Sequence, residues 1–291
     1  MRKRPLGVDG PEVSVVGFGG MPLSIQDRPD EAQGIRTIHA ALDAGMTLID
    51  TADVYCLHQD DMGHNERLIA AALATWPGDA DGIVVATKGG LERPDGRWTR
   101  NGRPEHLRAA ADASLAALGV ERIDLYQLHA PDPDVPFEES VGALADLHEA
   151  GKIDRVGLSN VSVKQIEAAE AIVPIASVQN RLSPFFREAI EGGVVEYCDR
   201  NGIAFLAYSP VGGGRLNKKL PDHPAVHSIA HRQDVSPHSV VLAWVLGQGS
   251  GVIIIPGART EAHARDSAAV ADLELSAEDL CAIDEAEFST A

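Results

Sequence analysis

Short apolar runs alternate along the chain with longer segments in which apolar residues recur at helical spacing. The first pattern indicates buried strands and the second indicates amphipathic helices. Strands are predicted at Val13–Phe18, Met46–Asp50, Gly82–Thr87, Arg122–His129, Ile153–Ser159, Ala176–Gln179, Ile203–Tyr208 and Gly251–Ile255. Helices are predicted at Glu31–Ala44, Asn65–Leu73, Pro104–Leu118, Phe137–Ala150, Val163–Ala171, Glu188–Asn201, Pro237–Leu246, Glu261–Ala271 and Ser276–Glu287.

This alternation predicts an α/β fold, a (β/α)₈ TIM barrel. Strands joined by crossover helices run parallel, and eight such units close into a barrel. A short N-terminal β-hairpin is expected over Leu6–Ser14 with its turn at Asp9-Gly10, and the last helix is extra to the barrel. An open doubly wound sheet would need a glycine-rich turn leading into the first helix, which Gly17–Ser24 does not provide. No break in composition divides residues 1–291, so one domain is expected.

Composition and charge limit the classes of partner that the chain is expected to bind. The formal net charge is −18, which disfavours nucleic acid and anionic membranes. No apolar stretch is long enough to span a membrane, and the basic N-terminus lacks the apolar segment of a signal peptide. Three scattered cysteines argue against a disulfide framework, so a cytoplasmic location is expected. The expected partner is a small molecule. The oligomeric state is left open, and a monomer is compatible with the sequence.

Polar residues end the predicted strands. Barrel enzymes work at the carboxyl ends of their strands, where this chain places Asp50, Lys88 and His129, with Tyr55 shortly after Asp50. Each has an ordinary structural explanation, such as a capping carboxylate, a solvated lysine, a hydrogen-bonded core histidine or a packing aromatic. Together on one rim they predict a proton-donating site.

The chemistry explains why these four residue types belong together. A tyrosine hydroxyl is a weak acid with a pKa of about 10. A neighbouring lysine would stabilise its phenolate and make it more acidic, and a carboxylate would keep that lysine charged. A histidine opposite could orient a substrate carbonyl.

At these residues the sequence resembles the aldo-keto reductase superfamily. The likeness lies in Gly45–Tyr55, Val85–Lys88, Asp124–His129, Arg155–Asn160 and the segments Val178–Asn180 and Ala207–Pro210. It implies that Asp50, Tyr55, Lys88 and His129 form the catalytic tetrad of an NADPH-dependent reductase of aldehydes or ketones. Hydride would come from the nicotinamide and the proton from Tyr55. The alternatives are alcohol or sugar oxidation, or a cofactor-carrying regulatory partner of the channel β-subunit type.

The resemblance also implies a cofactor site. Ser159, Asn160 and Gln179 would hold the nicotinamide carboxamide, Tyr208 would stack on its ring, and the glycines after Pro210 would let phosphate approach the backbone. The full expected set is Gly20, Met21, Asp50, Ser159, Asn160, Gln179, Tyr208, Ser209, Pro210, Gly212, Gly213, Gly257, Arg259, His263, Asp266 and Ser267. Arg259 suits a 2′-phosphate, which favours NADP(H) over NAD(H). The family usually ends this segment Glu-Asn, whereas this chain has Asp266-Ser267.

The substrate pocket is expected to comprise Trp98, Tyr55 and His129. Trp98 lies in the long segment Gly89–Arg103, and long loops at this rim commonly carry function. It could instead cover only its own loop. His58–His64 contains two histidines and two carboxylates, but their spacing matches no standard zinc pattern, so no metal is expected.

Overall fold

The computed structural model describes residues 1–291, and its centre is a sheet of eight parallel strands. In order around the sheet these are β3 (Phe18–Gly19), β4 (Leu48–Asp50), β5 (Val84–Gly89), β8 (Ile123–Leu128), β9 (Ile153–Ser159), β10 (Ile175–Arg181), β11 (Ala204–Tyr208) and β12 (Val252–Ile254). The two edges meet, because the Gly17 amide donates to the Ile254 carbonyl at 2.8 Å and the Gly19 amide donates to Pro256 at 3.0 Å. The sheet is therefore a closed TIM barrel, as predicted.

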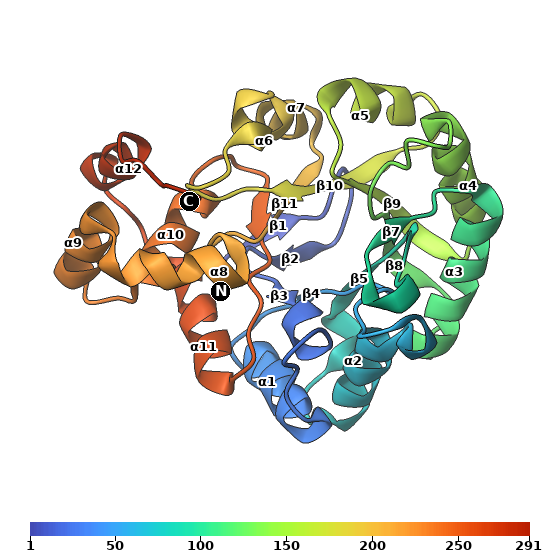
Figure 1. Ribbon diagram of the computed structural model, residues 1–291, viewed down its shortest axis with the longest axis horizontal. Coiled ribbons are helices and arrows are strands. Elements are labelled where there is room, and N and C mark those ends of the chain that lie inside the picture. The colour runs from blue at the N-terminus through green and yellow to red at the C-terminus, as the bar shows by residue number, and fades with distance from the viewer.

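Helices surround the strands (Figure 1). They are α1 (Glu31–Asp43), α2 (His64–Thr75), α3 (Pro104–Leu118), α4 (Phe137–Glu149), α5 (Val163–Glu170), α6 (Glu188–Glu191), α7 (Val194–Asn201), α8 (Gly213–Leu216), α9 (Pro224–Gln233), α10 (Pro237–Leu246), α11 (Glu261–Ala269) and α12 (Ala277–Asp284). Every residue of α10 from Ser239 to Leu246 is buried. Helix α9 packs against both α10 and α12, so this side of the barrel has a second helical layer.

Most of the apolar core lies in two clusters. One apolar cluster fills the space between strands and helices, and a smaller one fills the barrel interior. Leu6 and Val13, from the hairpin formed by β1 (Lys3–Pro5) and β2 (Glu12–Ser14), belong to the interior cluster and are fully buried. The hairpin therefore closes one end of the barrel with apolar side chains, and the polar strand ends lie at the other.

Several predicted bounds are wrong at the N-terminal half of the barrel. The expected first strand Val13–Phe18 is divided, because Val13 and Ser14 pair within the hairpin and only Phe18–Gly19 forms the barrel strand. The hairpin pairs β1 with β2, with Asp9 at φ 55° in the turn between them. The segment expected as a loop, Gly89–Arg103, contains a second hairpin of β6 (Leu91–Glu92) and β7 (Thr99–Arg100).

The C-terminal half differs in two further ways. The helix expected over Glu188–Asn201 is two helices, because Gly193 between them has φ 72° in the left-handed region. The stretch expected as a glycine-rich loop contains α8 and α9. Helix α9 starts at Pro224 and buries Val226, Ile229 and Ala230 at helical spacing.

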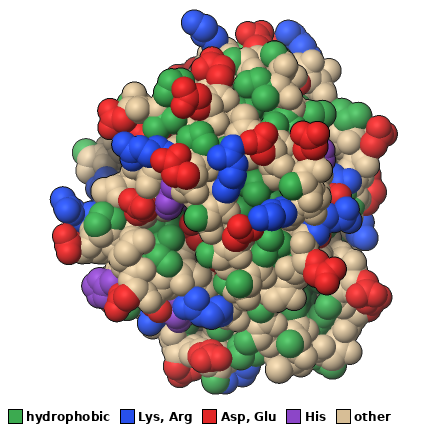
Figure 2. Space-filling view, turned by 90° about the vertical axis from the view of Figure 1, so that its right-hand side faces the viewer, with side chains coloured by type: hydrophobic (Ala, Val, Ile, Leu, Met, Phe, Trp, Pro, Cys, Tyr) green, Lys and Arg blue, Asp and Glu red, His purple; other side chains and the backbone are tan.

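Side chains of both charge signs are scattered over the face shown in Figure 2, and neither sign forms a continuous tract there. No helix has both the length and the apolar character needed to cross a bilayer.

Candidate active site

The strand order places the predicted catalytic residues on neighbouring elements. Asp50 is the last residue of β4, Lys88 lies near the end of β5, and His129 directly follows β8. These strands are adjacent and parallel, with Asp50 opposite Ala86 in the sheet register. Because adjacent parallel strands bring their carboxyl ends to one rim, side chains distant in sequence meet there.

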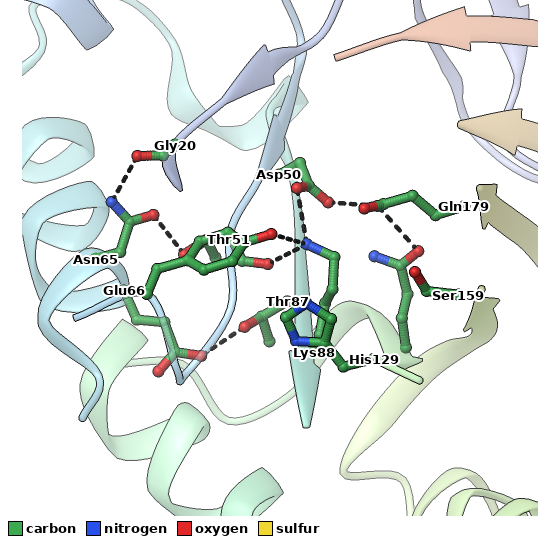
Figure 3. Close-up of polar contacts among 12 residues, drawn as sticks. Gly20, Asp50, Thr51, Asn65, Glu66, Thr87, Lys88, His129, Ser159 and Gln179 are labelled. Carbon is green, nitrogen blue, oxygen red and sulfur yellow. Dashed lines mark hydrogen bonds and ion pairs between the residues drawn. The ribbon is translucent and has the colours of Figure 1, made fainter. Parts of the chain in front are cut away.

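Lys88 is the centre of this group (Figure 3). Its Nζ donates to Asp50 Oδ1 at 2.8 Å, to the Thr51 carbonyl at 2.8 Å and to Tyr55 Oη at 3.0 Å. The lysine side chain is fully buried, and those of Asp50 and Tyr55 are nearly so. An ammonium has three donors, so the three contacts satisfy all of them and fix the amine in place.

The protonation of this pair is set by burial and neighbouring charges. Burial alone lowers the pKa of Lys88, but Asp50 and Tyr55 outweigh it and the net shift is upward, so the amine is charged. Burial raises the pKa of Tyr55 to about 12, although Lys88 opposes the shift. The sequence-based expectation of a more acidic Tyr55 is therefore wrong in its net direction, because desolvation of the phenolate outweighs the ammonium. Tyr55 holds its proton at neutral pH.

His129 is neutral. Burial, and then the charge on Lys88, hold the pKa of its imidazole well below its ordinary value. Its ring centroid lies 5.8 Å from that of Tyr55, and its buried Nδ1 has no protein partner. An uncharged imidazole beside a protonated phenol presents hydrogen-bonding groups without adding a second cation next to Lys88.

A second buried chain extends from Asp50 into the barrel. Gln179 Nε2 donates to Asp50 Oδ2 at 2.7 Å and lies 3.3 Å from Gln127 Oε1. Both glutamines are buried. The Gln179 amide is thus oriented with its nitrogen toward Asp50, and its oxygen remains available as an acceptor.

Near the Gln179 amide, two strands are followed by residues other than glycine whose backbone is left-handed. Asn160 has φ 60° and Ser209 has φ 50°. The Asn160 amide donates to the His129 carbonyl and to Ser159 Oγ, each at 3.0 Å, while its oxygen accepts from Tyr208 Oη at 2.8 Å. Such conformations persist when surrounding contacts over-determine them, and they cluster at functional sites.

The residues expected at the adenosine end lie on or before α11. Arg259 donates from Nε to the Pro22 carbonyl at 3.1 Å and from Nη2 to Gln26 at 2.8 Å, so its planar group is tied to the loop after β3. His263 is exposed in the first turn of α11. Asp266 turns toward the start of α10, where it accepts from Ser236 Oγ at 2.8 Å. Asp266 and Ser236 help to line a cleft of about 340 Å³ between α10 and α11.

Trp98 lies beside the proposed reaction centre. Its ring centroid is 6.3 Å from that of Tyr55 and 6.5 Å from that of His129, both in edge-on arrangements. It is 46% exposed, whereas the other two rings are buried. The three residues expected to form the substrate pocket are therefore neighbours, with Trp98 on the solvent side.

The His58–His64 segment uses its side chains elsewhere. Asp61 pairs with Arg28 at 2.6 Å, and His64 Nδ1 lies 2.8 Å from Ser24 Oγ. No group of three or more His, Cys, Asp or Glu side chains is arranged to hold a metal ion.

Comparisons with known proteins agree with this geometry. The model of the Aldo/keto reductase family matches residues 15–287. The chain belongs to the aldo-keto reductase family. A soybean (Glycine max) protein named probable aldo-keto reductase 1 is 36% identical over 312 aligned positions, covering 97% of this chain and 87% of the relative. Family membership makes the protein an NAD(P)H-dependent oxidoreductase.

Solved aldo-keto reductases share the fold over nearly the full length. A glycerol dehydrogenase from Gluconobacter oxydans superposes with a TM-score of 0.83 at 31% identity, covering 97% of this chain and 94% of that one. An aldo/keto reductase from Klebsiella pneumoniae, solved in complex with NADP and acetate, gives 0.81 at 26% identity, covering 98% and 95%.

The sequence did not reveal the residues on α2 that support the strand ends next to the candidate active site. Asn65, at the start of α2, donates to the Gly20 carbonyl at 2.9 Å and accepts from Thr51 Oγ1 at 2.7 Å. Glu66 accepts from Thr87 Oγ1 at 2.6 Å. A Cβ at Gly20 would lie 2.4 Å from Asn65 Oδ1, so only glycine fits there. No signal identified these residues, because they belong to a polar helix start outside the barrel.

Proposed function

We propose that this aldo-keto reductase reduces the carbonyl group of a small aldehyde or ketone with NADPH, and that Tyr55 donates the proton. The observation that carries the proposal is the buried chain from Asp50 through Lys88 to Tyr55, closed by contacts of 2.8 and 3.0 Å. Each group would have a defined role: the Asp50 carboxylate fixes the Lys88 ammonium, and the ammonium faces the Tyr55 oxygen, which becomes negative when the proton leaves.

Tyr55 and His129 would act together on the substrate. Lys88 keeps its charge, so as Tyr55 releases its proton the developing phenolate meets a cation already in contact. That stabilisation requires no reorganisation at the moment of reaction. The neutral His129 imidazole would hydrogen-bond the substrate oxygen and orient it. Because burial raises the pKa of Tyr55 to about 12, its hydroxyl carries at neutral pH the proton that carbonyl reduction consumes.

The strand ends supply groups that suit a dinucleotide. When bound, NADPH would provide the hydride. The free Gln179 oxygen and the Ser159–Asn160 pair offer acceptors and donors for a carboxamide. Gly212 and Gly213 have φ 85° and 75°, and nothing beyond its own helix and chain neighbours lies within 4 Å of the Cβ position at Gly214. Backbone of this kind can approach a phosphate closely.

The reaction can be tested directly. Purified protein, NADPH and a panel of aldehydes and ketones are mixed, and nicotinamide absorbance is followed while the alcohol product is quantified. We expect NADPH to be consumed in equal amount to the alcohol formed. A protein that binds NADPH tightly but reduces nothing in a broad panel would instead support the cofactor-carrying regulatory role.

The preference for NADPH is assigned to Arg259. Its two backbone contacts fix the guanidinium at the start of α11, and a fixed fork suits a phosphate monoester. Arg259→Ala should reduce kcat/KM for NADPH roughly tenfold or more while affecting NADH far less, since a charge-assisted hydrogen bond contributes on that scale. Arg265→Ala, an exposed arginine on the same helix, is the matched comparison. An unchanged NADPH-to-NADH ratio in the Arg259 variant would remove this assignment.

A further inference from the structure

Arg93 is a buried cation without a counter-ion. It lies between β6 and β7 and is only 6% exposed. Its Nε and Nη1 are buried without a hydrogen-bonded acceptor, although the Cys56 thiol is nearby, and Nη2 makes only a long contact of 3.4 Å to the Leu57 carbonyl. No carboxylate oxygen lies within 4 Å of the guanidinium, which forms none of the ion pairs in this protein.

This arrangement is unusual on energetic grounds. Removing a charge from water without pairing it is costly, so buried arginines normally contact carboxylates or fill their donors. A shortage of acidic residues does not explain the missing counter-ion, because the chain has 43 acidic residues against 25 basic ones. An arginine kept unpaired among so many acids indicates that its partner comes from outside the chain.

The guanidinium lies next to the proposed reaction centre. Its Cζ is 4.2 Å from the centre of the Trp98 ring, whose other neighbours are the rings of Tyr55 and His129. The indole therefore neighbours both the carbonyl-reducing groups and the cation. A molecule with its carbonyl at Tyr55 that extends past Trp98 would therefore come close to Arg93.

The surrounding loop has the opposite charge balance to the protein. Between Glu92 and Arg103 there are four arginines and two acidic residues, whereas the whole chain has a net charge of −18. The charged residues of this loop are Glu92, Arg93, Asp95, Arg97, Arg100 and Arg103. An anion is therefore attracted locally to a molecule whose overall field repels it.

We infer that the substrate carries an anionic group, a carboxylate in the simplest case, beside its reducible carbonyl, and that Arg93 binds this group. The inference rests on the carbonyl reduction proposed above and adds a substrate class to it. A carboxylate accepts two parallel hydrogen bonds from a guanidinium, which would satisfy the nitrogens that the protein leaves free. Because those nitrogens are buried, Trp98, which packs on the guanidinium, would have to move aside as the carboxylate binds. Arg93 is then a specificity-determining residue for oxo-acids over neutral carbonyl compounds.

The competing explanation is that Arg93 only supports Trp98 through their cation–π contact. The two roles differ in one respect. A support for Trp98 would affect charged and neutral substrates alike, whereas an anion-binding residue affects only the charged one.

The test uses two aldehydes of nearly equal shape, 4-carboxybenzaldehyde and 4-carbamoylbenzaldehyde, with NADPH. Wild-type protein should have a kcat/KM roughly ten- to a hundredfold higher for the carboxylate, the scale of a charge-assisted pair. Arg93→Met, which keeps the length of the stem, should bring the ratio close to one. Arg122→Met, which changes an exposed arginine just before β8 at the opposite end of the barrel, should leave the ratio unchanged.

Either of two results would overturn the inference: equal kcat/KM values for the two aldehydes in wild type, or an equal loss for both in Arg93→Met. A binding measurement covers the case in which neither aldehyde is reduced, which would count against the proposed function alone. Benzoate should bind the NADPH-loaded wild type about tenfold more tightly than benzamide, with an advantage that falls as salt rises. Equal binding of benzoate and benzamide would refute the assignment without any reference to turnover.

Discussion

Tyr55→Phe should lower kcat for carbonyl reduction by roughly 10²–10⁴-fold, the range expected when a positioned general acid is removed. The substitution deletes one hydroxyl and leaves Lys88 bound to Asp50 and to the Thr51 carbonyl. The fold should therefore persist, and NADPH affinity should change far less than the rate. Steady-state kinetics with a reactive aldehyde, together with fluorescence titration of NADPH, measure both quantities.

Tyr126→Phe is the matched control. Tyr126 is fully buried, and its hydroxyl makes only a long contact of 3.4 Å to the Leu107 carbonyl. Its loss should reduce the rate much less than that of Tyr55. Wild-type turnover in Tyr55→Phe would refute the proposed mechanism, and another proton donor would have to be sought at the same rim.

Lys88→Met should damage both activity and stability. The variant leaves the Asp50 carboxylate buried without its cation, and breaking a buried pair in this way typically costs about 3–5 kcal/mol in the free energy of unfolding. The rate should fall roughly 10²-fold or more, because the phenolate forming at Tyr55 no longer faces an ammonium. Chemical denaturation and steady-state kinetics test the two effects separately.

The double variant Lys88→Met with Asp50→Asn distinguishes the two effects. Because it leaves no unpaired charge, it should recover much of the lost free energy of unfolding. Activity should stay low, since the cation beside Tyr55 is still absent. Recovery of both stability and rate would show that the ammonium contributes nothing to proton donation.

The barrel could be predicted because its signals are local. Pro104 and Gly119 mark the two ends of α3, and the structure reproduces that helix with the same bounds. The bounds failed where a local feature was ambiguous: Gly193 interrupts a helical pattern, and Pro224 begins a helix in a segment dominated by glycines and charges. Propensity is a weak guide in such segments, and tertiary contacts decide the outcome.

The candidate site was only partly accessible from sequence. Asp50, Lys88 and His129 could be placed together because strands of a barrel end at one rim. Arg93 could not, because an arginine in a loop is ordinarily solvated, and its lack of a partner is visible only in three dimensions. The net pKa of Tyr55 also depends on the depth of burial, which a motif does not specify.

The hairpin of β6 and β7 would place substrate selection on a different segment of the chain from proton transfer. It leaves and rejoins the barrel at neighbouring points, where the Asn101 amide donates to the Gly90 carbonyl at 3.0 Å. The residues proposed for proton transfer lie at or just after the ends of the barrel strands, whereas the residues that would select the substrate lie on this hairpin. Exchanging the hairpin as one cassette between its closing residues should therefore change which molecules are accepted while leaving the reaction itself intact. Substrate range in this scaffold can then diversify by replacement of a short surface segment, without compensating changes in the barrel.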